Sequence, residues 1–296
     1  MGERVWTVGD ALGWTVEYLG RKGDEHPRRS AEWLLSAATG LSRVELYAHH
    51  DRPLTPDERQ RYRTLVARRA EGMPLQYVTG EMPFRHLVVH VEPGVFIPRP
   101  ETEVLVDVVL EGLAASTGPD AARVVDLCTG SGCVAVSLAT ERPNTDVWAV
   151  DADERAIRAA HRNALHAGVT DRVQVLHGDL FGPLPQELAG SVDCIVSNPP
   201  YVPSADIPGL PAEVLGFEPH RALDGGLDGL DVFRRIAEEA HAWLAPGGLL
   251  AVELDSTRVA EAARLLAGRY ERVTVRKDLT GRDRIVIGWK GRAMHS

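Results

Sequence analysis

Residues 124–135 read Val-Val-Asp-Leu-Cys-Thr-Gly-Ser-Gly-Cys-Val-Ala, and they indicate the fold of most of the chain. A short apolar run ends at Leu127, a turn with Gly130 and Gly132 follows, and a second apolar run begins at Val134. This pattern is typical of a strand, a tight turn and a helix. Glycines in such a turn let the backbone approach a ligand closely at the carboxyl end of the strand. The stretch therefore predicts a nucleotide-binding α/β sheet.

Strands and helices are predicted to alternate from here to the end of the chain. Such alternation indicates a mainly parallel sheet covered by helices on both faces. The last two strands have no helix between them, so one of them should run antiparallel. The expected strands are 123–127, 146–150, 172–176, 192–197, 249–254, 272–276 and 284–289, and the expected helices are 134–140, 154–167, 230–244 and 259–267.

The amino-terminal part has the pattern of short helices. Apolar residues recur at helical spacing from Val8, and Thr55-Pro-Asp-Glu58 predicts a capped helix that ends near Gly72. Residues 75–79 and 84–91 are predicted as the strands of a hairpin, with Glu92-Pro-Gly94 as a turn. We therefore predict a helical domain over 1–74, a β-hairpin linker over 75–99 and an α/β domain over 100–290.

Composition narrows the class of protein. The chain has 296 residues, of which 44% are hydrophobic and 25% are charged, as in ordinary globular proteins. The net charge of −9 argues against stable binding to a nucleic-acid backbone. Three cysteines, the absence of a signal-peptide core in residues 1–6 and the absence of a membrane-length apolar run predict a cytoplasmic protein.

The most chemically informative motif is Asn198-Pro-Pro-Tyr201, which follows an apolar strand. Two prolines supply carbonyl acceptors without N–H donors, the asparagine oxygen adds another acceptor, and the tyrosine ring offers a flat face. Such a pocket suits a planar NH2 group of an amide, a base or a guanidine. The alternative interpretation is a simple proline-rich exit from the strand.

The glycine turn leaves two cofactors open. Gly130, Gly132 and Ala135 fit the dinucleotide fingerprint, so NAD is one candidate. Asp126 opens the turn, where a carboxylate can meet a cationic amino-acid group, and a neighbouring strand ends in the acceptor motif. These two features favour S-adenosylmethionine.

Two further carboxylates follow strands. Asp151 can accept hydrogen bonds from ribose hydroxyls. Asp179 can accept from the amine of an adenine on which Leu180 packs, or it is simply a turn aspartate. The predicted cofactor-binding residues are Asp126, Cys128, Thr129, Gly130, Ser131, Gly132, Asp151, Asp179, Leu180 and Asn198.

The chain resembles the release-factor glutamine N5-methyltransferases, the HemK/PrmC family. The resemblance runs from about Gly72 to Trp289, and residues before it share only the family's helical character. It rests on six segments: Gly72–Glu81, Phe96–Glu103, Asp126–Gly132, Asn198–Tyr201, Phe217–Leu230 and Asp278–Arg284.

The resemblance implies a class I S-adenosylmethionine-dependent methyltransferase with a Rossmann-like, mainly parallel sheet behind a small helical substrate-recognition domain. It also implies methyl transfer to the glutamine amide of the Gly-Gly-Gln motif in a peptide chain release factor, with S-adenosylhomocysteine as product. The expected catalytic residues are Asn198, Pro199, Pro200 and Tyr201. The expected pocket-lining residues, each of which could instead be structural, are Phe96, Arg99, Glu101 and Glu218.

Two sites depart from the family pattern. Cys128 stands where the family usually has glycine, and Glu253-Leu-Asp-Ser-Thr257 replaces the usual Glu-Ile-Gly followed by Gln. A paralogue that methylates a free amide or guanidine, such as arginine, would keep the acceptor pocket and change these neighbours. Methylation of a nucleic-acid adenine and a non-enzymatic sensor of NAD or of another nucleotide are the remaining alternatives.

No metal site is expected. The segment from Asp224 to Asp231 resembles a calcium loop but lacks a closing glutamate, and Asp228 is expected to cap the next helix. The histidines show no ligand spacing.

Overall fold

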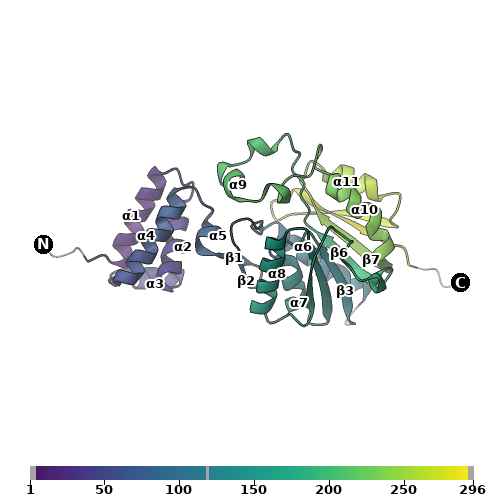
Figure 1. Cartoon of the computed structure of the whole chain (residues 1–296), viewed down its shortest axis with the longest axis horizontal. Coiled ribbons are helices and arrows are strands. Elements are labelled where there is room, and N and C mark those ends of the chain that lie inside the picture. The colour runs from purple at the N-terminus through teal and green to yellow at the C-terminus, as the bar shows by residue number, and fades with distance from the viewer. Residues whose placement is uncertain (1–4, 118–119, 293–296) are drawn as a thin grey trace. The chain divides into compact units, whose positions relative to one another are not determined.

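The computed structural model describes residues 5–117 and 120–292. These form two compact units, shown in Figure 1: one comprises the chain up to Glu81 together with Pro211–Phe217, and the other comprises Met82–Leu210 and the chain from Glu218 onward. The prediction of no signal peptide concerns residues 1–6, and residues 1–4 of these lie outside the described residues. Within the described ranges, no helix combines the length and the hydropathy that a membrane span requires.

The first unit is helical, as predicted. The helix predicted after Thr55 begins with a capping box in which the Thr55 side chain accepts from Glu58 and the Glu58 side chain accepts from Thr55. Gly72 follows that helix with φ +88°, as a glycine after a helix end does. The helices are α1 (Val8–Arg21), α2 (Pro27–Thr39), α3 (Arg43–Ala48), α4 (Pro56–Ala70), α5 (Leu75–Thr79) and α9 (Ala212–Phe217).

The predicted strand over 75–79 is wrong, because this segment is helix α5. Leu75 and Val78 are three residues apart and both enter the core of the helical unit, which only a helical turn allows. Gly80, with φ +80°, ends the helix by donating its N–H to the carbonyl of Gln76. The apolar residues of this segment fit both the two-residue period of a strand and the 3.6-residue period of a helix, and packing against the core selects the helix.

The hairpin lies elsewhere than predicted. Its strands are β1 (Glu81–Phe84) and β2 (Leu87–His90), so the predicted strand over 84–91 is too long and contains the turn. Arg85 takes a positive φ of +53° in that turn, and its guanidinium group bonds Glu141 and Asp107. The predicted turn at Glu92–Gly94 is confirmed: the N–H of Val95 donates to the Glu92 carbonyl.

The second unit is built on a seven-stranded sheet with the order β5-β4-β3-β6-β7-β9-β8. The strands from β5 to β7 are parallel, whereas β9 pairs antiparallel with both β7 and β8. The predicted parallel sheet with a terminal antiparallel hairpin is confirmed. The strands are β3 (Ala122–Leu127), β4 (Thr145–Asp151), β5 (Val173–His177), β6 (Val192–Ser197), β7 (Leu244–Glu253), β8 (Arg272–Lys277) and β9 (Asp283–Trp289).

Helices cover both faces of this sheet (Figure 1). Helices α6, α7 and α8 pack side by side on one face, and α10 and α11 cover the other. The core beneath α10 and α11 joins residues such as Phe233 and Val259 to Leu127 and Ile195 of the central strands. The helices are α6 (Thr102–Ser116), α7 (Cys133–Glu141), α8 (Glu154–His166), α10 (Asp231–Trp243) and α11 (Val259–Leu266).

Helix α6 has no counterpart among the predicted elements. Its sequence from Val104 to Val109 is rich in β-branched residues, and five of these six positions are buried. A helix buried on most sides loses the amphipathic period by which helices are found in a sequence. Contacts with β6 and β7 and with helix α7 therefore stabilise a helix that local preference does not indicate.

Candidate active site

The carboxyl ends of four parallel strands meet at one edge of the sheet. Leu127 pairs with Val150 on one side and with Ser197 on the other, and Ser197 pairs with Val252. The chain passes from β3 to β4 on one side of β3 and later adds β6 on the other, which creates the crevice where such sheets bind ligands. The residues that follow these paired positions lie in one row: Asp151, Cys128, Asn198 and Glu253.

The turn after β3 has a left-handed backbone at three positions. Cys128, Gly130 and Gly132 have φ values of +58°, +57° and +78°. A Cβ on Gly132 would lie 2.9 Å from the Cβ of Ala160, so glycine lets α7 and α8 approach. A Cβ on Gly130 would meet no atom within 4 Å, so the backbone there borders open space. Cys128 takes a left-handed conformation that costs most residues about 1–2 kcal/mol and that glycine adopts freely.

Asp126, in the last turn-facing part of β3, stabilises this turn through its side chain. Only 1% of its surface is exposed, and its Oδ2 accepts from the Thr129 hydroxyl at 2.6 Å and from the Ala135 N–H at 3.2 Å. Burial raises the pKa of Asp126 to about 7. The structure thus gives this carboxyl a role in holding the start of α7, and its contact with a cofactor stays a prediction.

Asp151 links the ends of β3 and β4. Its Oδ2 accepts the Gly130 N–H and its Oδ1 accepts the Asp153 N–H, each at 2.9 Å. Burial raises the pKa of Asp151. Each carboxylate oxygen keeps further acceptor capacity, which the two hydroxyls of a ribose require. The buried Ser131 hydroxyl interacts with the Cys133 thiol but has no conventional hydrogen bond within residues 5–117 and 120–292, so it can also serve a ligand. These features fit a nucleoside cofactor.

The two residues predicted to contact an adenine, Asp179 and Leu180, lie in different environments. Asp179 is exposed and forms an ion pair of 2.5 Å with Arg235 of α10. Leu180 has φ +47° and packs into the core beneath α10 and α11. A contact of either side chain with an adenine stays a prediction, and Asp179 would exchange or share its Arg235 partner to make it.

The acceptor motif begins immediately after β6. Ser197 is fully buried, and its hydroxyl donates to the Leu127 carbonyl at 2.8 Å, which ties the ends of β3 and β6 together. The Asn198 Nδ2 donates to the Thr102 hydroxyl oxygen at 3.1 Å. This contact fixes the amide so that Oδ1 remains an acceptor, the orientation that binding of an NH2 group requires.

Two glycines hold the backbone of Tyr201. A Cβ on Gly225 would lie 2.8 Å from the Tyr201 Cα, and one on Gly229 would lie 2.3 Å from the Tyr201 carbonyl oxygen. Val202 forms two backbone hydrogen bonds with this segment. Its N–H donates to the Leu223 carbonyl, and its carbonyl accepts from the Gly225 N–H. The segment that resembles a calcium loop therefore shapes the acceptor motif.

Asp228 does not occupy the N-cap position that the sequence predicts. Leu230 is the N-cap of α10, and Asp228 accepts its N–H at 3.1 Å from outside the helix. Arg234 of the first helical turn also forms an ion pair with Asp228. The positive φ of Gly229 turns the chain after Asp228 and so separates this residue from the helix. In the described ranges, no three His, Cys, Asp or Glu side chains are grouped as metal ligands.

Three of the four predicted pocket-lining residues form one cluster. The Arg99 guanidinium lies 2.5 Å from the Glu218 carboxylate and 4.7 Å from the centroid of the Phe96 ring. The Glu218 side chain is only 2% exposed and also accepts the Ile97 N–H. Glu101 takes the N-cap position of α6, directly before Thr102.

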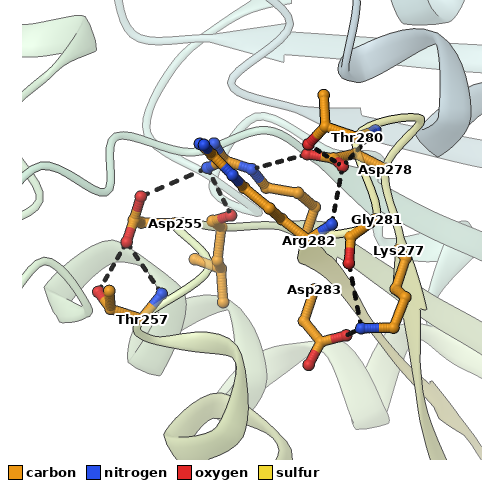
Figure 2. Close-up of polar contacts among 10 residues, drawn as sticks. Asp255, Thr257, Lys277, Asp278, Thr280, Gly281, Arg282 and Asp283 are labelled. Atoms are coloured by element: carbon orange, nitrogen blue, oxygen red, sulfur yellow. Dashed lines mark hydrogen bonds and ion pairs between the residues drawn. The ribbon is translucent and has the colours of Figure 1, made fainter.

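The segment that departs from the family pattern is held by Arg284 of β9. Its guanidinium reaches the Asp255 carboxylate and the Leu254 carbonyl at 3.4 Å, and the Asp278 carboxylate at 3.3 Å. Asp255 accepts from both the N–H and the hydroxyl of Thr257, which closes a turn (Figure 2). The unusual residues after β7 thus form an ordered, polar turn.

Comparison with known proteins identifies the chain. The model of the PrmC N-terminal domain matches residues 10–80, and that of the methyltransferase small domain matches residues 86–208. The release factor glutamine methyltransferase of Geobacter sulfurreducens is 45% identical over 289 residues, covering 96% of this chain and 97% of that protein. The Moorella thermoacetica protein of the same name is 42% identical, covering 96% and 99%. The chain belongs to the release factor glutamine methyltransferase family. It is therefore an S-adenosylmethionine-dependent N-methyltransferase.

Solved structures of other methyltransferases share the fold of this family member. The catalytic domain of hMettl16 aligns with a TM-score of 0.56 at 16% identity and covers 78% of this chain and 84% of its own. The T. thermophilus 16S rRNA methyltransferase RsmC aligns with a TM-score of 0.50 at 23% identity and covers 71% and 49%. At such identities the likeness establishes the class I methyltransferase fold.

Sequence reasoning missed two residues beside the acceptor motif. Thr102 contacts Asn198 across 96 positions of the chain, and buried Glu253 stands next to them at the end of β7. Both lie in segments quoted for the family resemblance or for departure from it. Nothing local in either segment, however, indicates that they meet.

Proposed function

We propose that this methyltransferase acts on the side-chain amide of a glutamine in a peptide chain release factor, within its Gly-Gly-Gln motif. The observation that carries the proposal is the pairing of Leu127 with Ser197. This pairing puts the cofactor turn and the acceptor motif side by side, so a methyl donor and an amide nitrogen can meet. The names of the full-length relatives support the choice of acceptor.

The cofactor would lie against the turn from Asp126 to Gly132, with its ribose on Asp151. S-adenosylmethionine supplies an electrophilic methyl group when it is bound there. Asn198 Oδ1 and the Pro199 carbonyl accept hydrogen bonds from the two N–H groups of the target amide. These contacts draw the nitrogen lone pair out of conjugation and toward the methyl group, while Tyr201 packs on the amide plane. Alignment supplies most of the rate.

The proposed transfer needs no strong base at the site. Burial raises the pKa of the Cys128 thiol and of the Tyr201 phenol, so both groups stay protonated at neutral pH. The nitrogen would attack through its own lone pair and gain the methyl group as that group leaves the sulfur of the cofactor. The surplus proton then leaves the nitrogen for water.

The helical unit is the proposed recognition domain for a protein substrate. A release factor is large and presents its glutamine on a loop, so a second contact surface beyond the pocket is useful. Residues 1–80 are nearly neutral in charge, which suits contact with a folded protein. We also propose that the enzyme acts in the cytoplasm, where its three free cysteines would stay reduced.

A panel of acceptors tests the proposal. The enzyme would be incubated with labelled S-adenosylmethionine and, separately, with a purified release factor, free glutamine, free arginine and mixed RNA. Label should appear in the release factor. Label in free arginine or RNA, with none in the factor, would establish one of the alternative acceptors and overturn the proposal.

Replacing Asp151 with alanine should weaken S-adenosylmethionine binding by about 1.5–3 kcal/mol, the range for a lost hydrogen bond to a charged group. Isothermal titration calorimetry measures this directly. Asp146→Ala is the matched control, because Asp146 lies exposed near the other end of the same strand. Equal affinities of the two variants would remove Asp151 from the cofactor site.

A further inference from the structure

We infer that Thr102 and Glu253 form a hydrogen-bonded relay that fixes the amide of Asn198 in its acceptor orientation. Both are positioning residues, and the inference rests on the proposed role of Asn198 as the acceptor for the target NH2 group. The three residues come from α6, β7 and the end of β6, and all lie in the α/β unit.

The contacts of the relay run in one direction. Asn198 Nδ2 donates to the Thr102 hydroxyl at 3.1 Å, and the nearby Thr102 hydroxyl lowers the pKa of the Glu253 carboxyl. Thr102 is 2% exposed and Glu253 is 1% exposed, so water does not compete for these groups. The second carboxyl oxygen, Oε2, has no hydrogen-bond partner in the described part of the chain. A buried and half-satisfied carboxyl is costly, which argues for a function.

The chemistry of the three groups sets the direction. An ionised carboxylate only accepts hydrogen bonds, so the Thr102 hydroxyl must donate its O–H to Glu253. The hydroxyl can then offer only its lone pairs to Asn198, which must present Nδ2 rather than Oδ1. The amide oxygen is left free for the substrate. If Glu253 were protonated, it could donate to Thr102, the hydroxyl could turn its proton toward Asn198, and the amide could rotate.

The relay is therefore sensitive to pH. Burial, opposed by the Thr102 bond and by Arg284, raises the pKa of Glu253 to about 7. The other charged or titratable groups around it are Glu101 before α6, Asp278 in the β8–β9 loop, Tyr201 after β6 and Cys133 of α7. Turnover at saturating cofactor should rise as the pH increases through about 7, because the ionised form orients Asn198.

Conformational stability should change in the opposite direction. The pKa of Glu253 is higher in the folded protein than in the unfolded chain, so this group favours folding below its unfolded pKa. That contribution is lost as the pH rises through about 7. Glu253→Gln should therefore be at least as stable as the wild type at pH 8 while turning over more slowly. A purely structural role predicts the reverse.

Nuclear magnetic resonance of the resting enzyme tests the relay without any substrate. The chain contains only three asparagines, Asn144, Asn163 and Asn198, so labelling of asparagine with nitrogen-15 gives three side-chain amides. The Asn198 amide should titrate with a midpoint near pH 7 in the wild type, and this titration should vanish in Thr102→Val and Glu253→Gln. An amide that does not titrate in the wild type, or titrates unchanged in both variants, would overturn the relay.

Kinetics with a Gly-Gly-Gln peptide supply the second readout. Thr102→Val should lower kcat roughly tenfold or more, since small misplacements of an aligning group cost that much. Thr102→Ser should restore kcat, and the double variant with Glu253→Gln should be no slower than Thr102→Val alone. Thr145→Val is the control, because Thr145 is 1% exposed and its hydroxyl has no partner among the described residues. Additive losses in the double variant would contradict the relay, whereas an inactive wild type would count against the proposed acceptor alone.

Discussion

Replacing Asn198 with alanine should lower turnover by about 100-fold or more while leaving the affinity for S-adenosylmethionine within a few-fold. The Asn198 oxygen contributes mainly in the transition state, where a positioned acceptor has its largest effect. Single-turnover kinetics on a release factor measures the chemical step, and calorimetry measures cofactor binding.

The control for this variant is Asn144→Ala, which removes an exposed asparagine at the opposite end of the sheet. Its turnover should match that of the wild type. If Asn198→Ala kept turnover within threefold of the wild type, the acceptor pocket would not be the site of methyl transfer. A comparable loss of cofactor affinity would instead show that Asn198 acts chiefly by binding the cofactor.

Removal of Arg99 should cost roughly 3 kcal/mol of stability, which is the largest effect that we expect on folding. The Glu218 carboxylate is 2% exposed, and without Arg99 it becomes a buried charge whose one remaining hydrogen bond among the described residues comes from the Ile97 N–H. Breaking one side of a buried pair is far more damaging than losing an exposed pair. For a unit of this size the melting temperature should fall by about 6–12 °C.

Arg158→Ala provides the comparison. Arg158 forms a pair of 3.7 Å with Glu154 on helix α8, and both side chains are more than half exposed. Loss of this pair should change stability by less than about 0.5 kcal/mol. Differential scanning calorimetry of both variants measures the difference. Equal melting temperatures would show that the pair of Arg99 with Glu218 contributes no more than a surface contact.

Sequence patterns predicted the sheet well because each strand is short, apolar and followed by a turn or a helix. They also placed Asp151 and Asn198 at strand ends, because the carboxyl ends of parallel strands share one edge. Segments whose structure depends on packing were harder. Helix α6 is buried on most sides and lost its amphipathic period, and α5 is a single turn whose apolar residues also fit a strand.

The contacts within the site were less accessible to prediction. Arg99 and Glu218 are both predicted pocket residues, but their ion pair joins positions 119 apart in the chain, and no local pattern indicates it. The position of Asp228 was equally hard to predict, because its place outside α10 depends on the backbone of Gly229 and on Arg234. The domain boundaries at 74 and 99, and the roles of individual site residues, stay predictions.

We propose that the methyl group goes to the glutamine amide of a release factor. The most direct measurement is tandem mass spectrometry of the factor after incubation with the enzyme and S-adenosylmethionine, with Asn198→Ala enzyme as the control. We expect a single added methyl group on the glutamine side chain of the Gly-Gly-Gln motif, and none with the control. A factor that stays unmodified while free arginine or an adenine base gains the methyl group would contradict the claim.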